Sequence, residues 1–187
     1  MLIKSNHFME ESKMKSLKLM LVALLIIVLT VGCSKDKQET PSSGEVSPKE
    51  VINQIQAELA KAYDVSLEDG VLPGYALIDM TNQDEMAMYE GIFNPEDIKS
   101  GYILQNLMNV RSELIMVAEG KDAKATESIK SSYEKVLSNQ EATWSTYLPD
   151  QYELVKNNKI KTKGNYILYV TSEESEKIIK IFEKAVK

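Results

Sequence analysis

Side chains that commonly carry chemistry are scarce in this chain of 187 residues, which has one cysteine and one histidine. Carboxylates are abundant, and Asp79, Asp84, Glu85 and Glu90 fall close together. Such a cluster could bind a hard cation or supply a carboxylate pair for acid/base chemistry on a glycan. The same residues also suit the start of a short helix, where the helix macrodipole favours negative charge. We expect this second, structural role.

A serine activated by a buried lysine is the other catalytic arrangement that these residues could build. The candidates are Lys121 or Lys163 with Ser128 or Ser131. However, Asp122 stands where a long periodic apolar segment begins, and aspartate is a preferred N-cap residue of helices. We therefore expect Asp122 to cap a helix and both lysines to be solvated.

The lone cysteine follows an apolar run, LMLVALLIIVLTV, at residues 19–31. A helix of that length spans about 20 Å, which is short against the roughly 30 Å of bilayer hydrocarbon. Lysines precede the run, and Gly32 separates it from Cys33. A basic segment, an apolar segment and a small residue in this order predict a secretory signal peptide.

The residues that end this segment, Leu29-Thr30-Val31-Gly32-Cys33, resemble the lipobox of bacterial lipoproteins. In that family diacylglycerol is joined to the cysteine thiol, and a peptidase then cleaves before the cysteine. Leucine is usual where this chain has Thr30, although threonine is tolerated there. The resemblance implies a signal peptide over residues 1–32 and a membrane lipid partner attached through diacylglyceryl-Cys33. The alternative is a cysteine buried in a transmembrane helix.

The true start is Met14 in our interpretation, because Glu10 and Glu11 do not suit the basic segment of a signal peptide. Removing residues 1–32 takes away four lysines, two glutamates and His7, which leaves 18 basic and 26 acidic residues and a net charge of −8. So acidic a chain is not expected to bind nucleic acid. Without histidine it can form neither a Ser-His-Asp triad nor a histidine zinc site. We expect no cofactor and no metal.

Residues 33–48 predict a lipidated cysteine followed by a disordered tether, since they are polar and almost free of large apolar residues. Fifteen such residues have a root-mean-square span of about 20 to 25 Å. This length would hold a domain at the outer face of the cytoplasmic membrane of a Gram-positive cell. The remaining residues, 49–187, are long enough for one hydrophobic core, and we expect a monomer.

Periodicity and turn residues predict the elements of this domain. A capping box at Ser47 to Glu50 starts a helix, a strand covers residues 75–80, and a short helix lies within residues 82–91. Two hairpins are predicted, one from strands 98–108 and 113–119 and one from strands 160–163 and 166–170 around a Gly164-Asn165 type II′ turn. Helices are predicted from Asp122 to about Gln140, after Pro149, and from Thr171 onward. The fold class is therefore α+β, with two antiparallel β-hairpins forming one sheet packed against several helices.

The segment from Val117 to Val170 contains the tracts VxxGKD, YLPDQY and KGNYIxxV. These tracts resemble a family of lipid-anchored Firmicutes proteins that is known only as a domain of unknown function. The resemblance covers about residues 50–187 and implies a surface lipoprotein. It carries no catalytic residues, and it implies a possible association with acylation of surface polysaccharides.

These observations favour a lipid-anchored extracytoplasmic binding or accessory protein that contacts an envelope protein or a glycan. The alternatives are an envelope enzyme that uses carboxylates and a structural component of a membrane complex. We expect a break between helices over residues 144–152, and there Trp144, Tyr147 and Tyr152 could form an exposed docking surface. The competing interpretation is that these rings cover the core, with their polar tips in water.

The lipobox generates the first prediction. The membrane-extracted protein should carry a diacylglyceryl adduct on an N-terminal Cys33, because the thiol is the atom modified in lipoproteins. Cys33→Ser should leave the unlipidated precursor, and intact mass measurement distinguishes the two forms. A wild-type protein without any lipid adduct would contradict the prediction.

Overall fold

The computed structural model describes residues 46–187 of the chain. The predicted signal peptide, Cys33 and nearly all of the predicted tether lie outside the described residues. Within the described part, helices, strands and 3-10 turns alternate along the chain in this order: α2 (Pro48–Ala62), β1 (Tyr75–Asp79), η1 (Glu85–Tyr89), η2 (Pro95–Asp97), β2 (Ile98–Asn106), β3 (Leu114–Gly120), α3 (Ala123–Tyr147), α4 (Pro149–Lys156), β4 (Lys159–Lys163), β5 (Tyr166–Thr171) and α5 (Ser175–Ala185).

The strands form one five-stranded sheet in the order β1-β2-β3-β5-β4. Every neighbouring pair is antiparallel. The two predicted hairpins, β2-β3 and β4-β5, are joined through β3 and β5, and β1 adds a strand beside β2. The predicted α+β class and the single sheet are confirmed.

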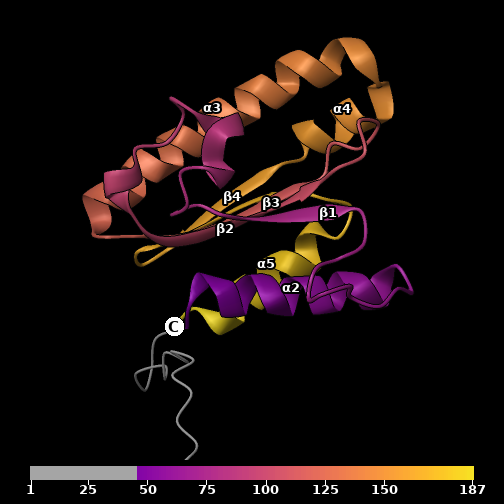
Figure 1. Ribbon diagram of the computed structural model, residues 1–187. Helices are drawn as coiled ribbons and strands as arrows, with labels where there is room; N and C mark the ends of the chain where they lie inside the picture. Colours follow the sequence, from indigo (N-terminus) through magenta and orange to yellow (C-terminus); the bar gives the residue numbers. More distant parts are fainter. Residues whose placement is uncertain (1–45) are drawn as a thin grey trace, which may run out of the picture. The chain divides into compact units, whose positions relative to one another are not determined.

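Helices cover both faces of the sheet, with α3 and α4 on one side and α2 and α5 on the other (Figure 1). Successive residues of a strand point to opposite faces, so the sheet contributes to two separate cores. One core joins the sheet to α2 and α5 through residues that include Leu104, Ile115, Val117, Leu168 and Val170. The other joins it to α3 and η1 through residues that include Ile103, Met116, Ala118, Ile167 and Tyr169.

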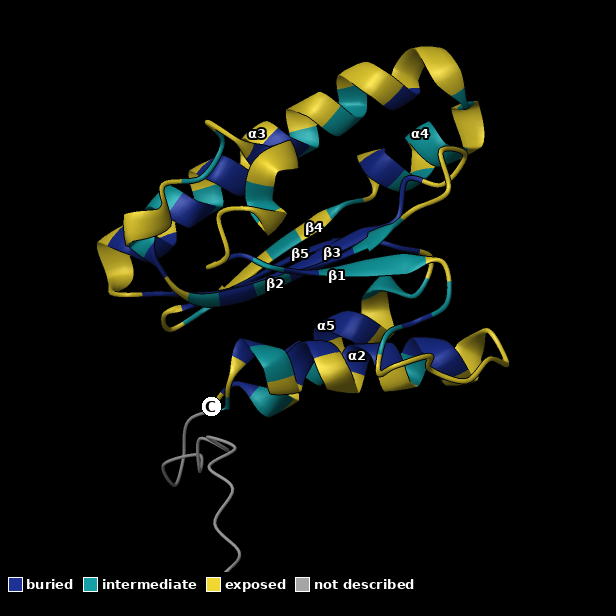
Figure 2. Cartoon of the chain, in the orientation of Figure 1, coloured by how far each residue is buried: buried dark blue, intermediate teal, exposed yellow. Residues whose placement is uncertain are grey.

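The two middle strands, β3 and β5, are buried at every residue. Figure 2 shows them as a dark band between two layers of helices. This double coverage explains why their sequences are apolar or aromatic almost throughout instead of alternating with polar residues. The expectation that residues 166–170 are covered on both faces is confirmed.

Local start signals were the most accurate predictions. Ser47 and Glu50 form the capping box, in which the Ser47 side chain accepts from the Glu50 backbone N–H while the Glu50 carboxylate accepts from the Ser47 N–H. The Asp122 carboxylate accepts from the Ala125 N–H at 2.8 Å and caps α3. At the second hairpin Gly164 has a φ of +58°, the sign that the first central residue of a type II′ turn requires.

Several element ends differ from expectation. Helix α3 continues to Tyr147 instead of ending near Gln140, because nothing before Pro149 interrupts it. Helix α5 begins at Ser175, since Thr171 still belongs to β5. The short helix within residues 82–91 is a 3-10 turn, and the β2-β3 connection is longer than expected, at residues 107–113.

Both edges of the sheet are protected against pairing with another strand. On β1, the N–H of Tyr75 donates to the Leu72 carbonyl at 3.0 Å and the N–H of Asp79 donates to the Glu85 carboxylate at 2.7 Å. On β4, lysines occupy alternate positions, Lys159, Lys161 and Lys163. Occupied donors and edge lysines are both features that disfavour strand addition.

Gly120, at the end of β3, lies directly against the start of α3. A Cβ atom at this position would come within 2.4 Å of Thr126 Oγ1 and 2.7 Å of Thr126 N. The backbone of a capped helix cannot shift away easily, so this contact sets how closely α3 approaches the sheet. The other close glycine, Gly101, would meet the flexible Met80 side chain at 2.8 Å.

Gly120→Ala should therefore lower the free energy of unfolding by about 3 kcal/mol, the upper part of the range for overpacking. Gly101→Ala is the matched control in the neighbouring strand. It should cost less, about 1 to 2 kcal/mol, because Met80 can rotate away and the Ala118 contacts, at 3.1 and 3.3 Å, are longer than those at Gly120. Urea unfolding of the two variants measures the difference. Equal losses would contradict the role assigned to Gly120.

Candidate functional site

A buried carboxylate, Glu113, lies at the end of the sheet where β3 begins. Its side chain is 9% exposed. Tyr63 donates its hydroxyl to Oε1 and Tyr75 donates its hydroxyl to Oε2, both at 2.8 Å. Ser172 and Asn106 add longer contacts of 3.4 and 3.5 Å. No lysine or arginine of residues 46–187 forms an ion pair with Glu113, so hydroxyl and amide groups alone satisfy it.

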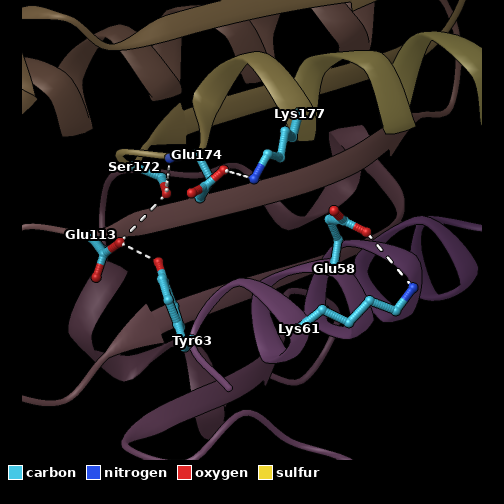
Figure 3. Close-up of polar contacts among 7 residues, drawn as sticks. All are labelled: Glu58, Lys61, Tyr63, Glu113, Ser172, Glu174 and Lys177. Atoms are coloured by element: carbon cyan, nitrogen blue, oxygen red, sulfur yellow. Dashed lines mark hydrogen bonds and ion pairs between the residues drawn. The ribbon is translucent and has the colours of Figure 1, made fainter. Parts of the chain in front are cut away.

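The partners of Glu113 come from four parts of the fold. Tyr63 follows the last turn of α2, Tyr75 begins β1, Asn106 ends β2 and Ser172 follows β5. Figure 3 shows the Tyr63 ring reaching up from the end of α2 and the Ser172 hydroxyl approaching from the other side. We refer to these five residues as the Glu113 cluster.

The Glu113 cluster keeps its tyrosines protonated. Burial, followed by the negative charge of Glu113, raises the pKa of Tyr75 to about 12. The same two causes, in the same order, raise the pKa of Tyr63 well above its ordinary value. Both hydroxyls are therefore hydrogen-bond donors at neutral pH and are poor candidates for a general base. Glu113 lines none of the cavities beside Trp144 and Met86. Its bonds join separate segments of the chain.

A second polar network holds the other side of the β2-β3 connection. The Ser112 N–H donates to Gln151 Oε1 at 2.8 Å, and the Gln140 amide donates to the Ser112 carbonyl at 2.9 Å. Gln140 Oε1 in turn accepts from the Tyr169 hydroxyl at 2.6 Å. Ser112 and Glu113 are adjacent, so the two networks fix the base of the connection from both faces of the sheet.

Two adjoining cavities lie beside this connection. They measure about 360 and 320 Å³ and share Met88, Gln105 and Trp144 as lining residues. We call them together the Trp144 groove. Its polar lining is mostly uncharged, with the side-chain amides of Gln105, Asn106, Asn109, Asn139 and Gln140, and Arg111 is its one charged lining residue.

The three residues predicted as a docking surface lie in different environments. Trp144 is only 8% exposed, which makes the expectation of an exposed ring at this position wrong. The ring packs inward because α3 extends beyond residue 144 and places the Trp144 side chain in the lining of the groove. Tyr147 is 52% exposed and its ring centre lies 5.8 Å from that of Trp144. Tyr152 is half-buried on α4, with Lys156 Nζ 5.0 Å from its ring centre.

The acidic residues singled out in the sequence do not converge on one point. Asp79 accepts from the N–H and hydroxyl of Thr81, and Glu85 accepts from the Asp79 N–H and the Asn82 amide. Asp84 and Glu90 line a separate cavity of about 550 Å³. Among residues 46–187 no group of three or more carboxylate, histidine or cysteine side chains could hold a metal ion.

The serine and lysine candidates are also apart. Ser128 donates to the Asp97 carboxylate at 2.6 Å and Ser131 to the Glu127 carbonyl at 3.1 Å. Lys121 pairs with Glu96, and Lys163 donates to the Glu183 carbonyl at 2.7 Å. The structure therefore brings neither lysine to either serine.

Sequence reasoning missed the Glu113 cluster altogether. Glu113 is separated from Tyr75, Tyr63 and Ser172 by 38, 50 and 59 residues. No spacing rule connects such distant positions. The one available signal was an acidic residue directly before a strand that begins with five apolar residues.

The cluster predicts a characteristic alkaline response. Because the folded-state pKa of Tyr75 is raised, its contribution to stability is complete below pH 10 and is lost as the pH rises towards 12. Tyr75→Phe removes this pH-dependent contribution. The free energy of unfolding of the variant should therefore fall less steeply between pH 10 and 12 than that of the wild type. At pH 7 the variant should lose about 1 to 2 kcal/mol, because Glu113 loses one donor.

The matched control is Tyr147→Phe, since Tyr147 is exposed and no described residue bonds its hydroxyl. It should leave both the neutral stability and the alkaline slope unchanged. Urea unfolding at a series of pH values measures the two quantities. A Tyr75→Phe variant with the wild-type slope would refute the assignment.

None of the helices in the described residues is long and apolar enough to cross a membrane. Comparison with curated proteins and with solved structures gave no significant match. A family model matches residues 77–172, which run from β1 to just past β5 and include Glu113 and Ser172. This match is narrower than the expected 50–187 and leaves out α2 and α5. It covers just over half of the chain, and the protein therefore belongs to the family described as a domain of unknown function, DUF4358.

Proposed function

We propose that this protein is a lipid-anchored extracytoplasmic binding protein that holds a segment of an envelope protein in the Trp144 groove. Attachment is through diacylglyceryl-Cys33 at the outer face of the cytoplasmic membrane of a Firmicutes cell. The lipobox resemblance supports the anchor. The surface around the groove supports binding.

The observation that carries the proposal is a gathering of exposed apolar side chains at the groove. Met88 is 72% exposed, and Leu107 and Met108 in the β2-β3 connection are 64% and 50% exposed. All three line the groove beside Trp144. Val110 and Tyr147 lie next to it and are 46% and 52% exposed. Contiguous apolar side chains at the surface of a soluble domain are typical of interaction sites.

The chemistry of the groove fits an apolar peptide segment better than a glycan. Sugar rings stack on open aromatic faces, and Trp144 is 8% exposed. Exposed methionines, by contrast, are flexible and are typical of surfaces that receive apolar side chains. Two of the amides along the groove, those of Asn109 and Asn139, form no side-chain hydrogen bond with the described residues and can bond peptide N–H and C=O groups.

The position of the groove is compatible with attachment at the other end of the domain. Helix α2 has 15 residues and so extends about 22 Å from Pro48 to its last turn. Tyr63, directly after α2, reaches Glu113 at the base of the connection that carries Leu107 and Met108. The chain therefore enters the domain about one helix length away from the groove.

The enzyme alternative receives less support from the same geometry. The buried Glu113 carboxylate already accepts from Tyr63 and Tyr75. The candidate serines, Ser128 and Ser131, bond carboxylate or carbonyl oxygens. The exposed apolar groove has no role in carboxylate catalysis. A binding role uses it directly.

The proposal predicts that Leu107→Glu with Met108→Glu abolishes partner capture in intact membranes. A photo-crosslinking amino acid at Met88 should trap one envelope protein through the groove, and the double substitution should reduce that product at least tenfold, because apolar contacts are replaced by charge. Melting temperature should hardly change, since both side chains are exposed. Mass spectrometry identifies the product, and the purified partner is then tested for direct binding.

The matched control is Val65→Glu with Leu67→Glu, two exposed apolar residues in the loop after α2. This variant should retain crosslinking. If both double variants retain it, or if only a glycan is captured, the peptide-binding proposal is wrong.

A further inference from the structure

We propose a second binding site, for a small organic cation with an apolar body, in the cavity of about 550 Å³ between η1 and the segment that leads into β2. We call it the Met86 cavity. Its volume lies within the range of small-molecule sites. Tyr89 is the one lining residue that it shares with the Trp144 groove, and the proposal does not depend on the proposed function.

One part of the wall of the Met86 cavity is apolar. Its walls include the side chains of Met80, Met86, Ala87, Phe93 and Ile98, together with Tyr89. Met80 and Ile98 are buried and belong to the core between the sheet and α3, so this wall is built on the rigid part of the domain. An apolar ligand body would replace water against these side chains.

The charged groups that line the cavity are both acidic, Asp84 and Glu90. Neither carboxylate has a hydrogen-bond or ion-pair partner among residues 46–187. By comparison, the neighbouring carboxylates of Asp79 and Glu85 accept bonds from Thr81 and Asn82. The two cavity carboxylates are thus the ones left available to a ligand.

The surrounding chain strengthens this negative field. Between Lys61 and Lys99 there are nine acidic residues and no lysine or arginine. The first lysines beyond this stretch are already engaged, Lys99 with Glu119 at 2.6 Å and Lys121 with Glu96 at 3.4 Å. An anionic ligand would be repelled, and a neutral one would leave the carboxylates without a counter-charge.

An ammonium group fits the site better than a metal ion. A hard cation needs several oxygen ligands, and the cavity offers two carboxylates in an apolar wall. An ammonium group needs a carboxylate and tolerates aromatic neighbours, which attract it through the ring face. Tyr89 and Phe93 both line the cavity, with ring centres 6.0 Å apart in an edge-to-face arrangement.

The test uses the mature lipoprotein in nanodiscs of zwitterionic lipid, with isotope-labelled methionine methyl groups observed by NMR. The probe is phenethylamine, and the neutral analogue is phenylethanol. Phenethylamine should shift the methyl signals of Met80 and Met86 but not that of Met116, which is fully buried in the sheet. Phenylethanol should bind about tenfold more weakly, because it lacks the charge.

Asp84→Asn with Glu90→Gln should weaken phenethylamine binding about tenfold and leave phenylethanol binding unchanged. Glu134→Gln with Glu173→Gln, two exposed carboxylates away from the cavity, is the control and should change neither. Added salt should weaken amine binding alone, which keeps the test valid if the first variant is unstable. The proposal would be overturned if the two probes bound with equal affinity, or if the shifted methyl signals lay outside the cavity. It would also be overturned if neither the carboxylate substitutions nor added salt changed the affinity for phenethylamine.

Discussion

At the end of the sheet where β3 begins, the structure depends on the hydrogen bonds of one buried carboxylate, that of Glu113. Burying a charged or polar group is costly unless it is hydrogen-bonded, and Glu113 is 9% exposed with no cationic partner among the described residues. Its donors come from the end of α2, the start of β1, the end of β2 and the residue after β5. The position of each of these segments is therefore tied to the same two oxygen atoms. Directional bonds therefore join these four segments to Glu113, directly before β3.

This constraint also explains why one loop can carry exposed apolar residues without collapsing. The connection at residues 107–113 is held at its base by Glu113 on one face and by the bonds of Ser112 with Gln151 and Gln140 on the other. Its outer part, with Leu107 and Met108, is then free to face the Trp144 groove. A rigid base beneath an exposed apolar tip is a suitable arrangement for a binding surface, because less ordering is needed on association.

Much of the fold could be predicted because its signals are local. The capping box at Ser47, the N-cap at Asp122 and the turn at Gly164 each depend on neighbouring residues only. The element order and the single sheet followed from these signals and from periodicity. The end of α3 was predicted too early, near Gln140, although residues 141–147 contain neither proline nor glycine that would interrupt a helix. The Glu113 cluster was inaccessible from the sequence, because its three hydroxyl donors lie 38 to 59 positions from Glu113. Asp84 and Glu90 could be singled out in the sequence. That they line a cavity together with the buried Met80 and Ile98 could not be predicted, because it depends on the tertiary fold.

The protected edges of the sheet affect how copies of the domain would associate if they were anchored to a membrane as proposed. Proteins tethered to a membrane diffuse in two dimensions, where neighbours meet far more often than the same number of molecules in solution. An open strand edge under such crowding would template chain-to-chain polymerisation. Here the outward N–H groups at both ends of β1 are already bonded, and lysines line β4. Under the proposed lipid anchor, copies of this domain could therefore gather at a membrane without pairing edge to edge.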